Sequence, residues 1–217
     1  METNMRRIAI VGAGGLAQEI WDLINYINLE KQQFEIIGFY DDAFSERTKI
    51  IGETDCLGPV SLLFEIKEEL SIVFGIANRK VVLSILKKFG EKKNFSYPNL
   101  VHPKSDLGFN FKMGHGNVIT SQCQITVNVK LGNFNFFNTN CCVGHNVEMG
   151  DFNCFMPRVQ ISGDVIIGNL NEFNMNSSIV QGKKVGDQNQ ILANTLLTKS
   201  IKNQRKYFGI PAKRIDL

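Results

Sequence analysis

The feature that most constrains this chain is an apolar side chain that recurs every six residues through its second half. From Val101 to Leu197, all seventeen positions at this spacing are apolar, and no insertion breaks the register. Hydrophobic residues make up 43% of the chain, so such a run arises by chance on the order of once in a million. A period of six keeps no single face on a helix of about 3.6 residues per turn, which favours short strands joined by corners. The positions are Val101, Leu107, Met113, Ile119, Ile125, Leu131, Phe137, Val143, Met149, Phe155, Ile161, Ile167, Phe173, Ile179, Val185, Ile191 and Leu197.

The residues between these apolar positions suit tight corners. The position after the apolar one is often glycine, and the position four beyond it is usually small or polar. Glycine and asparagine tolerate the positive φ values that corners need. We therefore predict a solenoid of hexapeptide repeats with three hexapeptides in each of about five triangular coils. Phe137, Phe155 and Phe173 are 18 residues apart and should stack in its core.

The first part of the chain has a different pattern, in which short apolar strands alternate with helices. Strands are expected at residues 8–11, 35–40 and 71–74, with helices after the first and the third. This alternation predicts a small Rossmann-like parallel sheet with helices on its faces. Ligands of such sheets bind beyond the carboxyl ends of the strands.

Candidate ligand-binding residues follow all three of these strands. The turn that contains Gly12, Gly14 and Gly15 offers bare backbone N–H groups at a helix N-terminus, which suits a phosphate. Asp41 and Asp42 end the second strand, where carboxylates accept hydrogen bonds from a ribose or a base, and Asn78 follows the third strand. About 90 residues are too few for both halves of a dinucleotide fold, so a mononucleotide or nucleotide sugar is expected. The alternative is a tight strand-to-helix turn without a ligand.

Composition excludes several classes of protein. The formal net charge of +3 argues against a nucleic-acid protein that depends on a broad basic surface. No apolar run approaches the roughly 20 residues of a membrane span, so none is expected. The five cysteines include no CxxC pair, which indicates a reduced, cytoplasmic protein.

The three histidines raise the question of a metal or a catalytic base. His115 and His145 occupy different positions in the hexapeptide, so they should not converge on zinc, and no metal is expected. His102 stands where the solenoid begins, and a structural role is expected for it. His145 lies between Gly144 and Asn146 in the middle of the repeats, where an exposed imidazole is suited to act as a general base.

Several short motifs together carry a family resemblance. They are Gly-Ala-Gly-Gly at 12–15, Phe39-Tyr40-Asp41-Asp42, Asn138-Thr139, the segment 143–151 around His145, Ile161-Ser162-Gly163 and Gly209-Ile210-Pro211-Ala212-Lys213. With these motifs, the chain resembles the bacterial nucleotide-sugar acyltransferases of the PglD and NeuD type over nearly its whole length. The resemblance implies a nucleotide-sugar-binding α/β domain at 1–95, a left-handed parallel β-helix at 96–198 and a C-terminal tail at 199–217.

The resemblance also implies an activity and a set of site residues. The activity is transfer of an acyl group from acetyl-CoA to the amino group of a nucleotide-linked amino sugar in surface-glycan biosynthesis. The enzyme would be a homotrimer with active sites between subunits. His145 would be the general base, with Asn146 and Asn138 beside it, and transfer would be direct, without a covalent enzyme intermediate. Residues implied to hold the acyl-CoA are Cys154, Gly163, Ala193, Pro211 and Lys213.

Three positions depart from the family pattern and leave two alternatives open. Asn146 stands where an acidic residue usually follows the histidine, Cys154 replaces a second histidine, and Leu16 replaces a polar residue. One alternative is a sugar O-acetyltransferase of the NeuD type, which would demand more from the base. The other is a homologue that binds both ligands without turnover. An asparagine orients an imidazole but does not stabilise its charged form as a carboxylate does, which mildly favours an amine acceptor.

Overall fold

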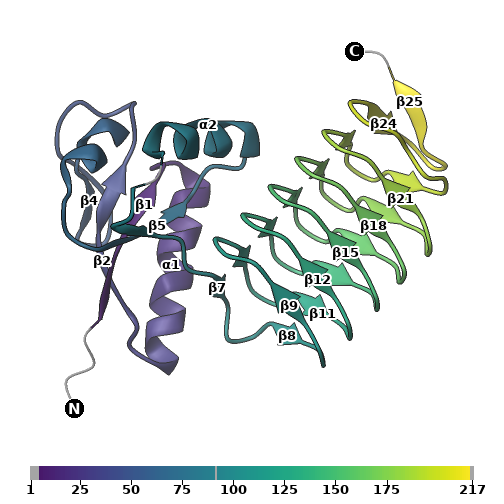
Figure 1. The fold of residues 1–217 in the computed structure, drawn as a ribbon, viewed down its shortest axis with the longest axis horizontal. Coiled ribbons are helices and arrows are strands. Elements are labelled where there is room, and N and C mark those ends of the chain that lie inside the picture. Colours follow the sequence, from purple (N-terminus) through teal and green to yellow (C-terminus); the bar gives the residue numbers. More distant parts are fainter. Residues whose placement is uncertain (1–4, 91, 216–217) are drawn as a thin grey trace. The chain divides into compact units, whose positions relative to one another are not determined.

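The computed structural model describes residues 5–90 and 92–215. The chain divides into two compact units, Met1–Leu100 and Val101–Leu217 (Figure 1). The division into functional segments at 95/96 and 198/199 remains a prediction. In the part of the chain that is described, no helix is long and apolar enough to cross a membrane.

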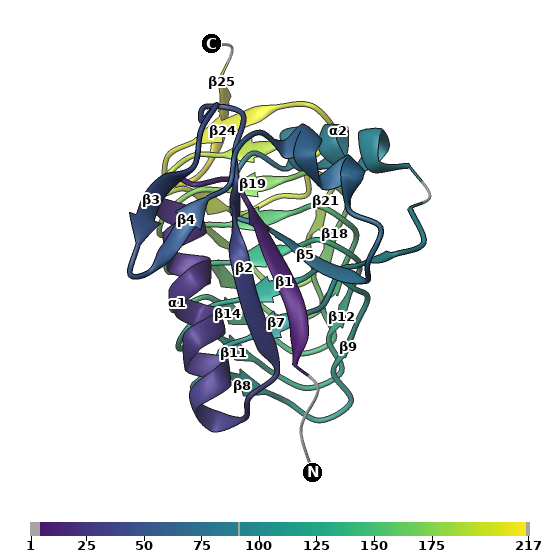
Figure 2. The same ribbon diagram turned by 90° about the vertical axis from the view of Figure 1, so that its left-hand side faces the viewer.

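The first unit is built on a six-stranded sheet with the order β3-β4-β2-β1-β5-β6. Its neighbouring strands pair in parallel, except that β3 and β4 form an antiparallel edge hairpin. Figure 2 shows β1 and β2 side by side in this sheet with α1 next to them. The elements are β1 (Arg6–Val11), α1 (Gly15–Glu30), β2 (Phe34–Tyr40), β3 (Thr48–Ile51), β4 (Thr54–Cys56), the 3-10 helix η1 (Val60–Glu65), β5 (Leu70–Phe74), α2 (Arg79–Phe89) and β6 (Phe95–Ser96).

The alternation of strands and helices predicted for this unit is confirmed. The centre of β1 is fully buried from Ile8 to Val11, as its apolar run indicates. One face of α1, which includes Ile20 and Ile24, is also buried, because its apolar residues recur at helical spacing. Sequence analysis missed β3, β4, η1 and β6, because these elements are short and carry no clear apolar period.

Three parallel sheets form the sides of the second unit, whose coils are stacked in Figure 1. The first sheet contains β7 (Leu100–Val101), β10 (Val118–Ile119), β13 (Phe136–Phe137), β16 (Cys154–Phe155), β19 (Glu172–Phe173), β22 (Gln190–Ile191), β24 (Lys206–Phe208) and β25 (Lys213–Ile215). The second contains β8 (Asp106–Leu107), β11 (Gln124–Ile125), β14 (Cys142–Val143), β17 (Gln160–Ile161), β20 (Ser178–Ile179) and β23 (Leu196–Leu197). The third contains β9 (Lys112–Met113), β12 (Lys130–Leu131), β15 (Glu148–Met149), β18 (Ile166–Ile167) and β21 (Lys184–Val185).

This unit is the predicted left-handed parallel β-helix. Each coil takes 18 residues, so that Phe155 pairs in register with Phe137 on one side and Phe173 on the other. The last strand, β25, departs from the pattern, because it folds back antiparallel to β24 and closes the sheet with a hairpin.

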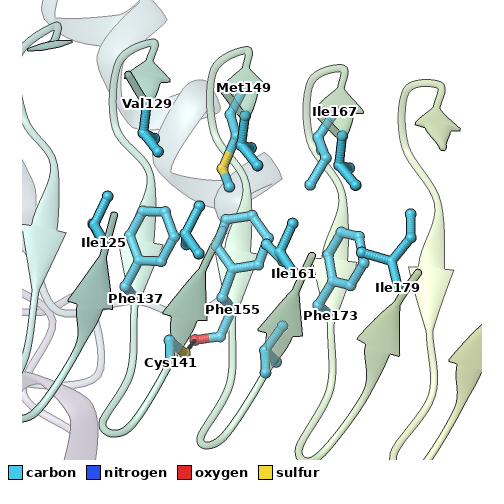
Figure 3. Packing of buried hydrophobic residues seen from close by; sticks show 14 of the residues in the cluster. Ile125, Val129, Phe137, Cys141, Met149, Phe155, Ile161, Ile167, Phe173 and Ile179 are labelled. Atoms are coloured by element: carbon cyan, nitrogen blue, oxygen red, sulfur yellow. Dashed lines mark hydrogen bonds between the residues drawn. The ribbon is translucent and has the colours of Figure 1, made fainter. Parts of the chain in front are cut away.

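The predicted phenylalanine stack lies in the core of the β-helix (Figure 3). The ring centroids of Phe137 and Phe155 are 4.6 Å apart, and those of Phe155 and Phe173 are 5.2 Å apart. All three side chains are fully buried. The apolar positions on the other two sides of the coils, such as Ile161 and Ile167, point into the same core (Figure 3).

Asparagines play two different roles in the coils. Asn146 and others at the corners have φ near 60°, as predicted, whereas a second set lies inside the β-helix. Asn153 in this inner set donates from Nδ2 to Oδ1 of Asn135 at 3.0 Å, and its own Oδ1 accepts from the backbone N–H of Asn171 at 2.9 Å. The inner set therefore satisfies backbone groups that would otherwise be buried without partners. It consists of Asn117, Asn135, Asn153, Asn171 and Asn189.

Candidate active site at a corner of the β-helix

His145 lies at the corner that joins β14 to β15, and half of its side chain is exposed. The corner is possible because Asn146 takes a left-handed conformation with φ of 58°. The backbone N–H of Asp164, one coil further on, donates to the carbonyl oxygen of His145 at 2.8 Å. This hydrogen bond and the strand pairing on either side hold the two corners in register.

Gly163 supplies the surface on which the imidazole of His145 rests. A Cβ atom at position 163 would lie 2.5 Å from both Cε1 and Nε2 of His145 and 2.9 Å from Nδ1. These distances are far below van der Waals contact, so any side chain at position 163 would displace the ring. Gly163 was predicted to contact acyl-CoA, which stays a prediction, and the structure places it directly against the predicted base.

We expect Gly163→Ala to displace His145 and to lower the kcat of the acetyl transfer that the resemblance implies by about tenfold or more, with the fold retained. The added methyl group forces the ring away from its present position while no buried apolar contact is lost. The measurement is steady-state kinetics beside a thermal unfolding curve. An unchanged kcat in a folded Gly163→Ala protein would show that this ring position is not the working one.

Asp164 is the residue of this site that sequence reasoning missed. Its Oδ1 accepts from Nδ2 of Asn146 at 2.9 Å and lies 3.8 Å from Nδ1 of His145. Gln181 donates to Oδ2 at 2.7 Å. The hydrogen bonds from Asn146 and Gln181, and the attraction of His145, lower the pKa of Asp164 below its ordinary value. The signal in the sequence was the 18-residue coil, which places Asp164 next to Asn146.

The other predicted catalytic residue, Asn138, lies at the preceding corner, after β13. Its Oδ1 accepts from the backbone N–H of Thr139 at 2.7 Å. His102 is buried and its Nδ1 accepts from the backbone N–H of Lys104 at 3.0 Å, in keeping with the structural role expected of it. His115 packs edge-on against the ring of Phe134, at a centroid distance of 5.1 Å. Among the described residues, no three His, Cys, Asp or Glu side chains are grouped as metal ligands would be.

The residues implied for acyl-CoA binding fall into separate places. Cys154 is buried in β16, with 2% of its surface exposed. Ala193 lies at the corner after β22, and Pro211 and Lys213 lie in the C-terminal hairpin. Hydrogen bonds tie this hairpin to the Ala193 corner and the next strand: Gly209 donates to Oγ1 of Thr195 at 3.3 Å, and Ala212 donates to the carbonyl oxygen of Leu196 at 2.8 Å. Ala193, Pro211 and Lys213 are therefore brought into one region.

The predicted glycine turn is open at the N-terminus of α1, and phosphate binding there remains a prediction. Gly12 has φ of 100°, and a Cβ there would lie 3.0 Å from the carbonyl oxygen of Gly75, so this position needs glycine. Gly14 is the N-cap of α1, and Gly15 is its first residue. A Cβ at either position would have no atom within 4 Å, so the backbone at the start of α1 is open to a ligand.

The polar residues predicted beside this turn already bind the backbone. Asp41 accepts from the N–H of Ala13 through Oδ2 at 2.8 Å and from the N–H of Ala43 through Oδ1 at 2.9 Å. Asp42 accepts from Val60 at 2.8 Å, and Asn78 caps α2 by accepting from Lys80 at 3.1 Å. Asp41 therefore fixes the glycine turn to the end of β2, a role that the sequence did not indicate. A carboxylate oxygen accepts more than one hydrogen bond, so contact with a ligand remains a prediction.

Comparison with known proteins agrees with this architecture. Residues 7–89 match the family model of the PglD N-terminal domain. No curated protein sequence matches the chain significantly.

Among solved structures, the acetyltransferase domain of PglB from Neisseria gonorrhoeae, in complex with acetyl coenzyme A, has a TM-score of 0.87 at 22% identity, covering 98% of this chain and 100% of that one. PerB from Caulobacter crescentus, in complex with CoA and GDP-perosamine, has a TM-score of 0.87 at 18% identity. The match covers 96% of this chain and 97% of the PerB chain. WeeI from Acinetobacter baumannii has a TM-score of 0.78 at 20% identity, and the match covers 97% of this chain and 100% of the WeeI chain. Residues 7–89 are thus similar in sequence to the PglD N-terminal domain, and the chain as a whole has the two-part fold of the PglB acetyltransferase domain and PerB.

Proposed function

We propose that this chain is an N-acyltransferase that moves the acetyl group of acetyl-CoA to the amino group of a nucleotide-linked amino sugar in surface-glycan biosynthesis. The observation that carries the proposal is the half-exposed imidazole of His145, 3.8 Å from a carboxylate at a corner of the β-helix. Further support comes from the match of residues 7–89 to the PglD N-terminal domain. Structures with the same fold include a domain bound to acetyl-CoA and an enzyme bound to CoA and GDP-perosamine.

The proposed reaction is direct transfer. The amine nitrogen attacks the thioester carbonyl carbon, an N–C bond forms, and the C–S bond breaks. His145 accepts the proton that the amine loses and returns it to the departing CoA thiolate, so CoA leaves as the free thiol. A backbone N–H group stabilises the oxyanion of the tetrahedral intermediate. No covalent bond to the enzyme is needed.

The proposed acyl-CoA site combines Gly163 and the C-terminal region, whereas Cys154, which the resemblance also implies, is buried and offers almost no surface to a ligand. Coenzyme A carries three phosphates, and the tail supplies cations that suit them. Ala193, Pro211 and Lys213 lie together at this end of the β-helix, as the hydrogen bonds of Gly209 and Ala212 indicate. The basic residues of the tail are Lys199, Lys202, Arg205, Lys206, Lys213 and Arg214.

The proposed nucleotide-sugar site lies at the glycine turn of the first unit. Gly12, Gly14 and Gly15 would receive the phosphates at the N-terminus of α1, where N–H groups and the helix dipole favour an anion. Asp41, Asp42 and Asn78 would line the same edge, because all three follow strands whose carboxyl ends meet there.

Gly14→Ala tests this nucleotide-sugar site. A Cβ at position 14 meets no protein atom within 4 Å, and φ is −74°, so we expect the variant to fold normally. The methyl group would occupy the space of a bound phosphate, so the KM for the nucleotide sugar should rise about tenfold while the KM for acetyl-CoA stays unchanged. Equal KM values for the sugar in Gly14→Ala and the unaltered protein would place the phosphates elsewhere.

The activity is tested by following thiol release from acetyl-CoA with a panel of UDP-, dTDP- and GDP-linked 3- and 4-amino sugars. Release with one acceptor identifies the enzyme and its sugar together. If no amino sugar causes thiol release while acetyl-CoA binds in calorimetry, sugars with hydroxyl acceptors are tested next, as for an O-acetyltransferase. No thiol release with those acceptors either would indicate a protein that binds both ligands without turnover.

We also propose that the protein is a homotrimer with active sites between subunits and that it works in the cytoplasm. The trimer rests on the resemblance to the PglD and NeuD-type enzymes. The cytoplasm is supported by the cysteines, all five of which are unpaired, as expected in a reducing compartment.

A further inference from the structure

We infer that Asp164, from the coil after His145, is the carboxylate that positions the imidazole and stabilises its protonated form, in place of the acidic residue missing at position 146. This inference rests on the proposed function, because it assigns a role toward the proposed general base. The distance from Nδ1 of His145 to Oδ1 of Asp164 is 3.8 Å, and both side chains are about half-exposed. The carboxylate has therefore moved by one coil of the β-helix rather than being lost.

A chain of hydrogen bonds leads to this carboxylate along one corner of the β-helix. Asn110 donates to Asn128 at 3.0 Å, Asn128 donates to Asn146 at 3.2 Å, and Asn146 donates to Asp164 at 2.9 Å. An ionised carboxylate only accepts hydrogen bonds, so Asp164 sets the direction of the whole chain. Asn146 must turn its NH₂ group toward Asp164 and its oxygen toward Asn128. The orientation of the residue next to His145 is thus decided by Asp164.

The same contacts show how the Asp164 carboxylate acts on the ring of His145. Nδ1 lies 3.2 Å from the amide nitrogen of Asn146, which donates and does not accept, so Nδ1 accepts this hydrogen bond while the ring is neutral. Asp164 holds the donating NH₂ group of Asn146 in place at 2.9 Å. When the ring is protonated, the Asp164 carboxylate is the negative charge beside Nδ1, at 3.8 Å. Asp164 therefore positions the imidazole through Asn146 and stabilises its protonated form through its charge.

Asp164 is the one carboxylate at the corners stacked in line with His145, and Lys183 is the other ionisable side chain there. Those corners carry Val127 with Asn128, Gly163 with Asp164, and Gln181 with Gly182. Charged side chains on the neighbouring strands are Lys130, Glu148 and Lys184, and the first two pair with each other at 2.7 Å. The hydrogen bonds from Asn146 and Gln181 lower the pKa of Asp164, so its charge is present whenever His145 gains a proton.

The first test is the titration of His145 by NMR, which needs no substrate. The chain has three histidines, and the signal of His145 is the one that disappears in His145→Ala. Asp164→Asn keeps the size of the side chain and an oxygen that accepts from Asn146, but it removes the charge. Because the lost charge lies 3.8 Å from Nδ1, we expect His145 to take up its proton at a lower pH in Asp164→Asn than in the unaltered protein when the ionic strength is low. The matched control is Glu172→Gln, a carboxylate in another sheet that accepts from Gln190 at 3.3 Å, and it should leave the titration unchanged.

The second test is kinetic and includes a rescue. We expect Asp164→Asn to lower kcat about tenfold or more with little change in either KM, and to move the acidic limb of the pH profile to lower pH. The double variant Asn146→Asp/Asp164→Asn puts the carboxylate beside His145 with the same residue composition, and it should recover most of the lost activity. Rescue separates a positioning role from a structural one.

The two tests keep this inference distinct from the proposed function. An unchanged His145 titration in a folded Asp164→Asn protein would overturn the inference, even if His145→Ala confirms the enzyme. A shifted titration in a protein that acetylates no acceptor would support the contact and overturn the proposed function. A loss of activity that Asn146→Asp does not rescue, with the titration unmoved, would reduce Asp164 to a structural residue.

Discussion

Replacing His145 with alanine is expected to lower the kcat of acetyl transfer by about 10²- to 10⁴-fold, the usual contribution of a general base. The substitution removes a half-exposed side chain at a corner whose backbone is held by hydrogen bonds, so the β-helix should keep its stability. Affinity for CoA should be retained, because the basic C-terminal tail is unchanged. The measurement is thiol release from acetyl-CoA with the acceptor found in the panel, beside calorimetry with CoA.

His115→Ala is the matched control for this experiment. His115 is also a histidine of the β-helix, but it packs against Phe134 and lies next to β9 rather than β14. We expect normal turnover from this variant. Full activity in His145→Ala would rule out the proposed base, and equal losses in both variants would point to damage to the fold.

Phe155→Ala is expected to have the largest effect on stability, about 3–5 kcal/mol of the free energy of unfolding. Phe155 is fully buried, and its ring stacks on Phe137 at 4.6 Å and on Phe173 at 5.2 Å. Removing the ring leaves a cavity in the middle of the stack, and the paired strands on both sides prevent the coils from closing it. The measurement is chemical denaturation followed by circular dichroism.

Phe109→Ala is the control for the loss of a phenylalanine from the coils. Phe109 is 83% exposed, so its removal should change the free energy of unfolding by less than about 0.5 kcal/mol. A destabilisation of Phe155→Ala no larger than that of Phe109→Ala would contradict the packing in Figure 3.

Much of the fold could be predicted because its signals are local. Phe137, Phe155 and Phe173 share one position of a repeat, and their stacking follows from the 18-residue coil alone. The strand, glycine turn and helix at the start of the chain are likewise neighbours in sequence. The edge hairpin of β3 and β4 was missed because pairing with the rest of the sheet, rather than a pattern of its own, holds it in place.

The candidate site was only partly accessible from the sequence. His145 stood out through its place in the repeat and its resemblance to a family motif, but Asp164 did not, although it occupies the position of Asn146 one coil later. Asp41 was expected to face a ligand, and the structure shows both of its oxygens accepting from backbone N–H groups. Such choices depend on which donors lie within about 3 Å of an oxygen, and distant segments supply those donors.

The sequence by itself determined the solenoid, its coil length and which side chains point inward, because a six-residue period assigns each side chain to the core or the surface. Tertiary structure decided the atomic contacts of the side chains at the exposed corners, which the coil length alone does not give. The contact of His145 with Gly163, and the chain of amides that ends on Asp164, arise from the exact superposition of corners 18 residues apart. Hydrogen bonds between the coils set that superposition, and no single coil has them alone.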